Sequence, residues 1–284
     1  MPSFKGNTAE KSAAIARARR VRLHVKQGRK RDELYWSQNE WCPCGKTCKE
    51  RGGPCDHSFY AHEYDIPIAL PYAERAFFIA LEPVKRAAAW PVKFARALPV
   101  GADDKRLNKA WRKFALTMLR HRKYGMLKCA YTHAQENAIL NVIKLFVAGD
   151  FENLSVWQEA SLAAMEAGRA EVAQTYGTKE SAKLRAQAGN KAAHVAANLA
   201  AAVADERQIA DAIPEAPSAL RDFWFADVMV ANEKNGSTYS SSEQDKQAAG
   251  WQQGACAWYS RQLLKNLHGG PVRHAFKAVR DLLP

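Results

Sequence analysis

Four cysteines and two histidines are crowded into a glycine-rich stretch near the start of the chain. The spacing C-x-C-x3-C-x6-C-x-H-x4-H occupies residues 42–62. Thiolates and imidazoles are the ligands that zinc takes in closed tetrahedral sites, and such a site can fold a loop too small for its own hydrophobic core. The sequence therefore predicts a structural zinc ion (Zn²⁺) whose candidate ligands are Cys42, Cys44, Cys48, Cys55 and His57.

Two other interpretations of the cluster stay open, namely a pair of local disulfides or four free thiols. Disulfides need an oxidising compartment, and residues 1–30 lack the apolar run of a signal peptide. The paired C-x2-C knuckles of common zinc fingers are absent, and an iron–sulfur or redox site is a weaker alternative. Cys129 and Cys256 stand alone in apolar helical stretches, so we expect them to be buried packing residues.

The strongly basic residues 103–125 form a second candidate site. Apolar residues recur there at intervals of three and four, the pattern of one buried helical face: Leu107, Trp111, Phe114 and Met118. We expect Asp103 to cap the start of this helix and Gly125 to end it in the left-handed conformation. The rest of its surface carries cations that could bind phosphates: Lys105, Lys109, Arg112, Lys113, Arg120 and Lys123.

A first basic segment precedes the cysteine cluster. Residues 9–27 read as a helix that Thr8 caps and Gly28 ends. It could lie along a phosphate backbone and become ordered on binding, or it could be a solvated terminal helix docked on the body of the protein. Its candidate phosphate ligands are Arg17, Arg19, Arg20, Arg22, Arg29, Lys30 and Arg31.

The positive charge is concentrated in these two segments. The formal net charge of the chain is +13. Residues 1–31 hold ten basic residues and one acidic residue, residues 84–128 hold thirteen and two, and the remainder is net acidic. A chain with one basic side and one acidic side is typical of proteins with an anionic partner.

Several enzyme and membrane classes are disfavoured. The phosphate-binding G-x-x-x-x-G-K-[ST], the dinucleotide G-x-G-x-x-G, the metalloprotease H-E-x-x-H and the hydrolase G-x-S-x-G motifs are all missing. We therefore expect a protein without catalytic activity; an enzyme that uses the Cys/His cluster with an open metal position is the weaker alternative. No apolar run approaches the ~20 residues that cross a bilayer, so we expect a cytoplasmic protein. An organellar transit peptide is a lesser alternative.

Helical patterns dominate the rest of the chain, and no alternating strand pattern stands out. The expected fold is an all-α multi-helix bundle with a small Cys/His-rich, metal-stabilised loop module near the N-terminus. We divide it into a basic N-terminal helix or arm (1–34), the Cys/His-rich module (35–66), a basic helical region (67–131), an alanine-rich helical scaffold (132–216) and C-terminal helices (217–284). Prolines are expected to separate short helices at Pro91 and to end a long one at Pro214.

Together these patterns favour a nucleic-acid-binding protein of phage or plasmid type. Its basic helical face would contact phosphates of DNA or RNA with little sequence specificity, supported by the structural zinc site. The alternative is a protein-interaction or assembly protein whose basic face meets an acidic protein partner.

Overall fold

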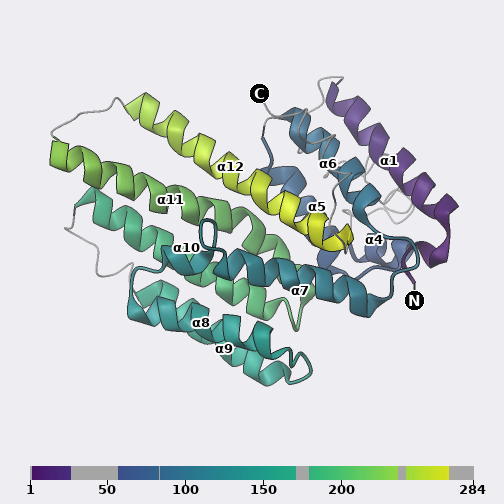
Figure 1. Ribbon diagram of the computed structural model, residues 1–284, viewed down its shortest axis with the longest axis horizontal. Coiled ribbons are helices and arrows are strands. Elements are labelled where there is room, and N and C mark those ends of the chain that lie inside the picture. Colours follow the sequence, from purple (N-terminus) through teal and green to yellow (C-terminus); the bar gives the residue numbers. More distant parts are fainter. Residues whose placement is uncertain (1, 27–56, 83, 171–178, 236–240, 269–284) are drawn as a thin grey trace.

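The computed structural model describes residues 2–26, 57–82, 84–170, 179–235 and 241–268. Within these ranges the chain forms ten α-helices and three short 3-10 helices, with no β-strand (Figure 1). The prediction of an all-α bundle is therefore confirmed for these residues. Cys42, Cys44, Cys48 and Cys55 lie outside them, so the Cys/His-rich module stays a prediction.

The α-helices differ widely in length. Their bounds are α1 (Thr8–Lys26), α4 (His57–Tyr64), α5 (Ala69–Ala80), α6 (Val84–Ala97), α7 (Asp104–Arg120), α8 (His133–Ala148), α9 (Leu154–Ala170), α10 (Glu180–Ala201), α11 (Ile209–Asn235) and α12 (Ser241–His268). The 3-10 helices are η1 (Ser3–Gly6), η2 (Met126–Cys129) and η3 (Glu206–Gln208). No helix among the described residues has both the length and the hydropathy that a bilayer span requires.

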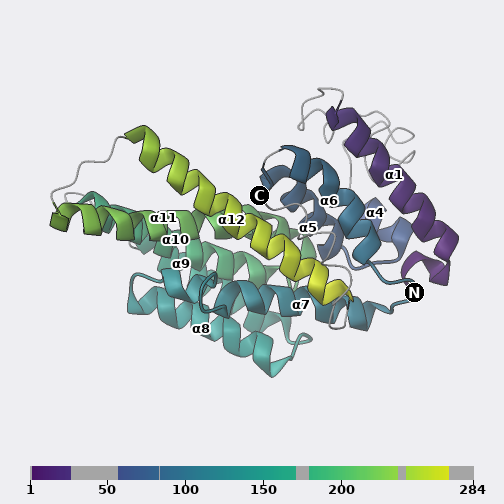
Figure 2. The ribbon, with the colours of Figure 1, turned by 45° about the horizontal axis from the view of Figure 1, so that its top comes forward.

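The long helices α10, α11 and α12 form one half of the molecule, with α8 and α9 packed along α10 (Figures 1 and 2). The other half gathers α1, α4, α5 and α6. Helix α7 runs from this second half into the first and packs on α12 and α8. A single cluster of buried apolar side chains extends through both halves, from Phe4 through Trp111 to Leu267.

Alanine makes close packing of α10 possible. The buried face of this helix consists largely of small side chains, including Ala188, Ala192, Ala196 and Ala200, each with no exposed surface. Small side chains allow helix axes to approach closely, and alanine has the highest intrinsic helix propensity. The alanine-rich stretch therefore lies between α9 and α11 as the centre of its half.

The start of α8 shows why one glycine of α10 is required. The Thr132 hydroxyl accepts from the Gln135 N–H, and the buried Gln135 side chain accepts from the Thr132 N–H, so the two residues form a capping box. A Cβ at Gly189 would lie 2.2 Å from the Gln135 Oε1. Gly189 thus leaves room for a cap that belongs to another helix.

Two predictions about helix ends were wrong. Pro91 lies inside α6, and Pro214 and Pro217 lie inside α11, although each removes a backbone hydrogen bond. Both Pro91 and Pro217 are buried, so packing offsets that loss. The long helix expected to end at Pro214 instead ends at Ala201. After it, the Asp205 side chain accepts from the Arg207 N–H and starts a separate 3-10 turn.

Candidate nucleic-acid interface

Helix α7 carries a row of exposed cations opposite its buried stripe. Asp103 caps its start as predicted, with its carboxylate 2.8 Å from the Arg106 N. The predicted stripe is buried in full: Leu107, Trp111, Phe114 and Met118 each show no exposed surface. The exposed cations, which we call the basic face, are Lys105, Arg106, Lys109, Lys113 and Arg120.

No ion pair to the basic face occurs among the described residues. Lys105, Lys109 and Lys113 follow one another at four-residue spacing, so they lie along one line of the helix. Like charges along one line repel one another. Nothing in the described part of the fold neutralises them, which leaves them available to an external anion.

Arg112 lies differently from its neighbours on α7. Its guanidinium carbon stands 3.7 Å from the centre of the Phe151 ring, and its Nε is buried without a hydrogen-bond partner. Burial lowers the pKa of Arg112, and the nearby Glu206 carboxylate opposes this effect. Arg112 therefore fastens α7 to the loop between α8 and α9, whereas the basic face points to solvent.

The predicted ligands of the N-terminal segment are only partly described. Arg17 pairs with the Glu63 carboxylate at 2.9 Å and donates to the Tyr64 hydroxyl at 3.0 Å. Burial raises the pKa of Tyr64 to about 12, with Arg17 acting in the opposite direction. Arg19 is exposed. Helix α1 packs on α6, and α7 runs away from it (Figure 1).

The remaining predicted ligands lie outside what the structure describes. Arg29, Lys30 and Arg31 fall beyond the described ranges. For Arg20 and Arg22 the structure describes the helical backbone only. His57 begins α4, and nothing is described of its side chain. Among the described residues, no three His, Cys, Asp or Glu side chains converge on a point that could hold a metal.

A tight turn at the end of α7 presents Lys123 and Tyr124. The His121 Nδ1 accepts from the N–H groups of both residues, at 3.3 and 3.2 Å. Gly125 then donates to the His121 carbonyl at 2.6 Å, and a Cβ on Gly125 would lie 2.5 Å from His121 backbone atoms. Its φ is −85°, so the expected left-handed conformation was wrong. Glycine is needed here for close approach.

Beside this turn, α11 and α12 enclose a groove of about 420 Å³. We call it the aromatic groove. Its lining residues are Lys123, Tyr124, Trp224, Asp227, Val228, Gly250, Trp251, Gly254 and Ala255. Its volume lies within the range of about 300–1,000 Å³ that ligand sites occupy.

Half-buried aromatic rings surround the aromatic groove. Tyr124 stacks on Trp258 with ring centres 4.6 Å apart, and its edge meets Trp224 at 5.8 Å. Trp224 in turn meets Trp251 edge to face at 6.3 Å. These tryptophans differ from Trp111 and Trp157, which are almost wholly buried in the core. The Lys123 ammonium lies 5.2 Å from the Tyr124 ring centre, which places a cation at the groove.

Buried side chains of η2 and α12 lie close to the turn that carries Tyr124. The Tyr259 hydroxyl donates to the Tyr124 carbonyl. Burial raises the pKa of Tyr259 well above its ordinary value. Cys129 and Cys256 are both buried, as expected, and burial raises the pKa of the Cys129 thiol to about 12. A thiol so far from ionisation is a packing group and not a nucleophile.

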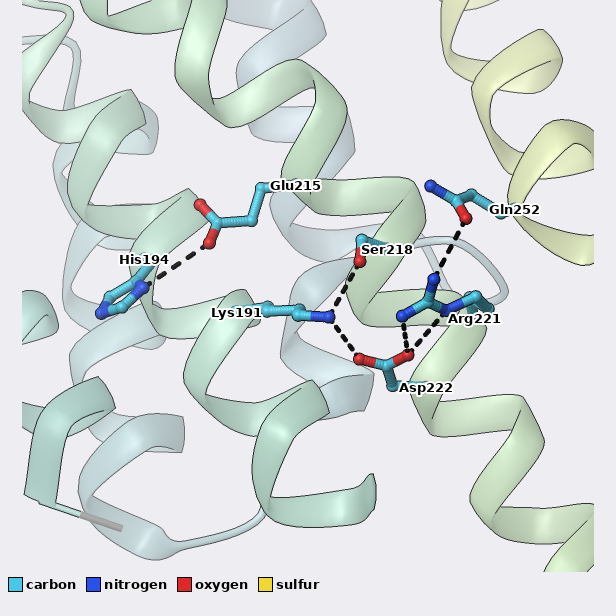
Figure 3. Close-up of polar contacts among 7 residues, drawn as sticks. All are labelled: Lys191, His194, Glu215, Ser218, Arg221, Asp222 and Gln252. Atoms are coloured by element: carbon cyan, nitrogen blue, oxygen red, sulfur yellow. Dashed lines mark hydrogen bonds and ion pairs between the residues drawn. The ribbon is translucent and has the colours of Figure 1, made fainter. Parts of the chain in front are cut away.

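A polar network between α10, α11 and α12 is a second candidate for chemistry (Figure 3). The Lys191 ammonium donates to the Asp222 carboxylate at 2.5 Å and to the Ser218 hydroxyl at 2.9 Å. Arg221 contacts the other Asp222 oxygen at 2.6 Å and reaches Gln252 at 3.5 Å. The Asp222 side chain is 3% exposed, and its charge is balanced by two cations whose side chains are 28% and 35% exposed.

A serine can act as a nucleophile when a neighbouring lysine acts as its base, but the lysine nitrogen then needs a free lone pair. Here the Lys191 ammonium is held by a carboxylate and itself donates to Ser218, so it cannot accept the Ser218 proton. Nearby, the His194 Nδ1 faces the Glu215 carboxylate at 3.6 Å (Figure 3). The network is therefore best understood as a tie between helices.

Sequence reasoning missed part of the candidate interface. Arg106 belongs to the basic face by its exposure, although it was not among the predicted ligands. Trp224, Trp251 and Trp258 lie on two helices far from α7 in sequence, and only the fold brings them to Tyr124. Gly250 and Gly254, four residues apart around Trp251 in a helical stretch, are the signal that could have marked this place.

Searches for similar proteins give no match to a family model, to a curated protein or to a solved structure.

Proposed function

We propose that the protein binds nucleic acid through the basic face of α7, with contacts chiefly to phosphate. The observation that supports this most directly is the line of exposed lysines with no ion pair among the described residues. A rigid helix with evenly spaced cations matches a repeating polyanion, and it offers few side chains that distinguish base edges. Binding should therefore depend weakly on sequence and steeply on salt.

The experiment compares two variants that remove the same charge. Lys105, Lys109 and Lys113 are replaced by Ala in the first, and Lys144, Arg169 and Lys183 on α8, α9 and α10 in the second. Affinity for a fluorescent DNA or RNA oligonucleotide is measured by anisotropy from about 50 to 200 mM salt. For the parent, affinity should fall on the order of 10³-fold across this range. Only the α7 variant should bind more weakly and with a flatter salt slope.

Equal loss in both variants would mean that total charge, and not this face, drives binding. If the parent fails to bind any oligonucleotide, the assembly alternative takes the place of this proposal. In that case the same face would meet an acidic protein.

We also propose that the Cys/His cluster holds a structural zinc near the basic segments. The donor set Cys42, Cys44, Cys48, and Cys55 or His57 supplies the soft ligands that a closed zinc site needs. Its role would be to fold the stretch that follows α1, because that stretch is too short to build its own core.

A further inference from the structure

We infer that the aromatic groove stacks unpaired bases, so that the protein prefers single-stranded over double-stranded nucleic acid. This inference rests on the proposed function and adds to it the form of the nucleic acid. Four features of the groove support it: its position at the end of the basic face, its half-buried rings, its charge, and the glycines of α12.

The groove lies where the basic face ends. Arg120 is the last residue of α7, and Lys123 in the following turn lines the groove. Both side chains are exposed, as is Arg122 between them. A phosphate backbone that follows the basic face therefore arrives at the groove with cations on its path. A strand in this position can place its bases in the groove while its phosphates stay on α7.

The rings are exposed to the degree that stacking requires. Tyr124, Trp224 and Trp251 are each half-buried, so they are fixed by the fold yet keep surface open to a ligand. Tyr124 and Trp224 meet at 80° and Trp224 and Trp251 at 73°, so the rings present walls in more than one direction. Base stacking on such rings tolerates any sequence, as binding through phosphates does.

The charge of the groove suits an anion with an aromatic part. Asp227 is the acidic residue of the lining, and it pairs with Arg185. Its negative charge is thereby compensated within the protein. Lys123 carries positive charge at the rim. A nucleotide can place its phosphate at this cation and its base on the rings, whereas an uncharged apolar partner would use the rings alone.

The glycines of α12 are the most specific feature. A glycine inside a helix costs about 1 kcal/mol relative to alanine. At Gly168 and Gly189 a Cβ would come within 2.9 and 2.2 Å of a neighbouring side-chain atom, so packing explains those residues. At Gly250 and Gly254 a Cβ would meet no described residue within 4 Å. Packing within the described part of the chain gives no reason for these glycines, but an external ligand that approaches the α12 backbone does.

The test fills the groove without touching the basic face. Gly254→Leu and, separately, Gly250→Leu each place a side chain in the groove. Both positions lie in a helix, and leucine has a high helix propensity. Each variant is compared with the parent for a single-stranded oligonucleotide and for its duplex at one salt concentration. Thermal unfolding verifies that the variants are folded, and their melting temperatures should not fall below that of the parent.

The parent should bind the single strand more tightly than the duplex. Each leucine variant should lose roughly tenfold or more in affinity for the single strand, the value of one stacked base. Its duplex affinity and salt slope should stay unchanged. The α7 variant, in contrast, should lose affinity for both forms. This contrast separates the groove from the basic face.

Three results would overturn the inference while the proposed function stands. One is a parent that binds strand and duplex equally well, and the second is a folded Gly254→Leu variant with unchanged affinity for the strand. Full displacement of the strand by an equal concentration of a nucleoside monophosphate would also overturn it, because the groove would then be a site for a free nucleotide. A parent that binds no nucleic acid overturns the inference and the proposed function together.

Discussion

The Tyr259 hydroxyl donates a hydrogen bond to the carbonyl oxygen of Tyr124, a residue 135 positions earlier in the chain. Tyr259 has no exposed surface, and its ring meets Phe114 edge to face at 6.4 Å. One side chain of α12 therefore contacts both the buried stripe of α7 and the turn that follows α7. The position of Tyr124 in the aromatic groove depends on this contact.

Tyr259→Phe should loosen that turn. The variant keeps the ring and its packing but leaves the Tyr124 carbonyl without its donor, which should cost about 1–2 kcal/mol of stability. Urea denaturation followed by far-UV circular dichroism measures this loss. Affinity for the single strand should fall more than affinity for the duplex. Unchanged stability would contradict the role that we assign to this hydrogen bond.

A half-buried carboxylate in η3 caps a distant helix, and it should make stability depend on pH. Glu206 accepts from the Ala69 N–H at 2.8 Å, at the start of α5. Desolvation by burial raises the pKa of Glu206, although hydrogen bonds from α5 and the charge of Arg112 oppose it. A raised pKa in the folded state means that ionisation is harder there than in the unfolded chain. The stabilisation that Glu206 gives the folded state is therefore complete below the ordinary carboxyl pKa. It is lost as the pH rises through the raised pKa of the folded state.

Glu206→Gln should remove this loss, because glutamine keeps an oxygen for the Ala69 N–H without the charge. We expect the variant to be at least as stable as the parent at neutral pH, with a flatter stability profile from about pH 4.5 upward. Glu206→Ala is the control, and it should cost about 1 kcal/mol through loss of the cap. Thermal melts at several pH values distinguish the three proteins. Parallel profiles for parent and Glu206→Gln would assign the pH dependence to other groups.

The same substitution should have opposite effects at two glycines. Gly189→Ala puts a Cβ against the Gln135 side chain and breaks the α8 cap, so it should destabilise by about 1–3 kcal/mol. The Cβ of Gly250→Ala meets no described residue within 4 Å, so this substitution should stabilise by up to about 1 kcal/mol. Thermal unfolding of the two variants provides the comparison. Stabilisation at Gly250 would show that the fold alone does not select glycine there.

Local patterns in the sequence predicted local structure well. The spacing of Leu107, Trp111 and Phe114 identified the buried face of α7, and Asp103 identified its start. The Thr132 cap is equally local, because every atom that forms it lies within three residues. Prediction failed at Pro91 and Pro214, where propensity argues for a break. At the buried Pro91, packing against neighbouring helices decides the outcome, and a linear pattern does not contain it. Pro214 is exposed, but its neighbours Ile213 and Ala216 are buried in the core.

The candidate site likewise has a part that local patterns predict and a part that depends on the fold. The basic face is periodic along one helix, so its cations other than Arg106 could be predicted from their spacing. Arg112 could not be separated from them, because its partner Phe151 follows the next helix. The aromatic groove joins a turn with α11 and α12, and Tyr124 and Trp251 are distant in sequence. Only the fold shows that they share one surface.

The zinc proposal has a direct test on the full chain. Elemental analysis of untagged protein should find close to one zinc per chain. Cys44→Ser should lower the metal content and the thermal stability of the protein, since the site supplies folding energy to its own segment. Cys129→Ser is a suitable control, because Cys129 is a buried cysteine far from the cluster in sequence. Protein free of metal, together with a Cys44→Ser variant that folds like the parent, would contradict the proposal.

Arg112 and Lys113 are neighbours in sequence, yet their substitutions should act on different properties. Arg112→Ala removes a guanidinium that stacks on Phe151, so it should destabilise the protein by about 1–2 kcal/mol and leave the salt slope of nucleic-acid binding nearly unchanged. Lys113→Ala removes an exposed cation, so stability should change by less than about 0.5 kcal/mol. For this variant the slope of log affinity against log salt concentration should become less steep by about 0.9, which is the value of one phosphate contact on a duplex. Urea denaturation and anisotropy titrations measure the two effects, and a Lys113→Ala variant that binds as the parent does at every salt concentration would place Lys113 outside the interface.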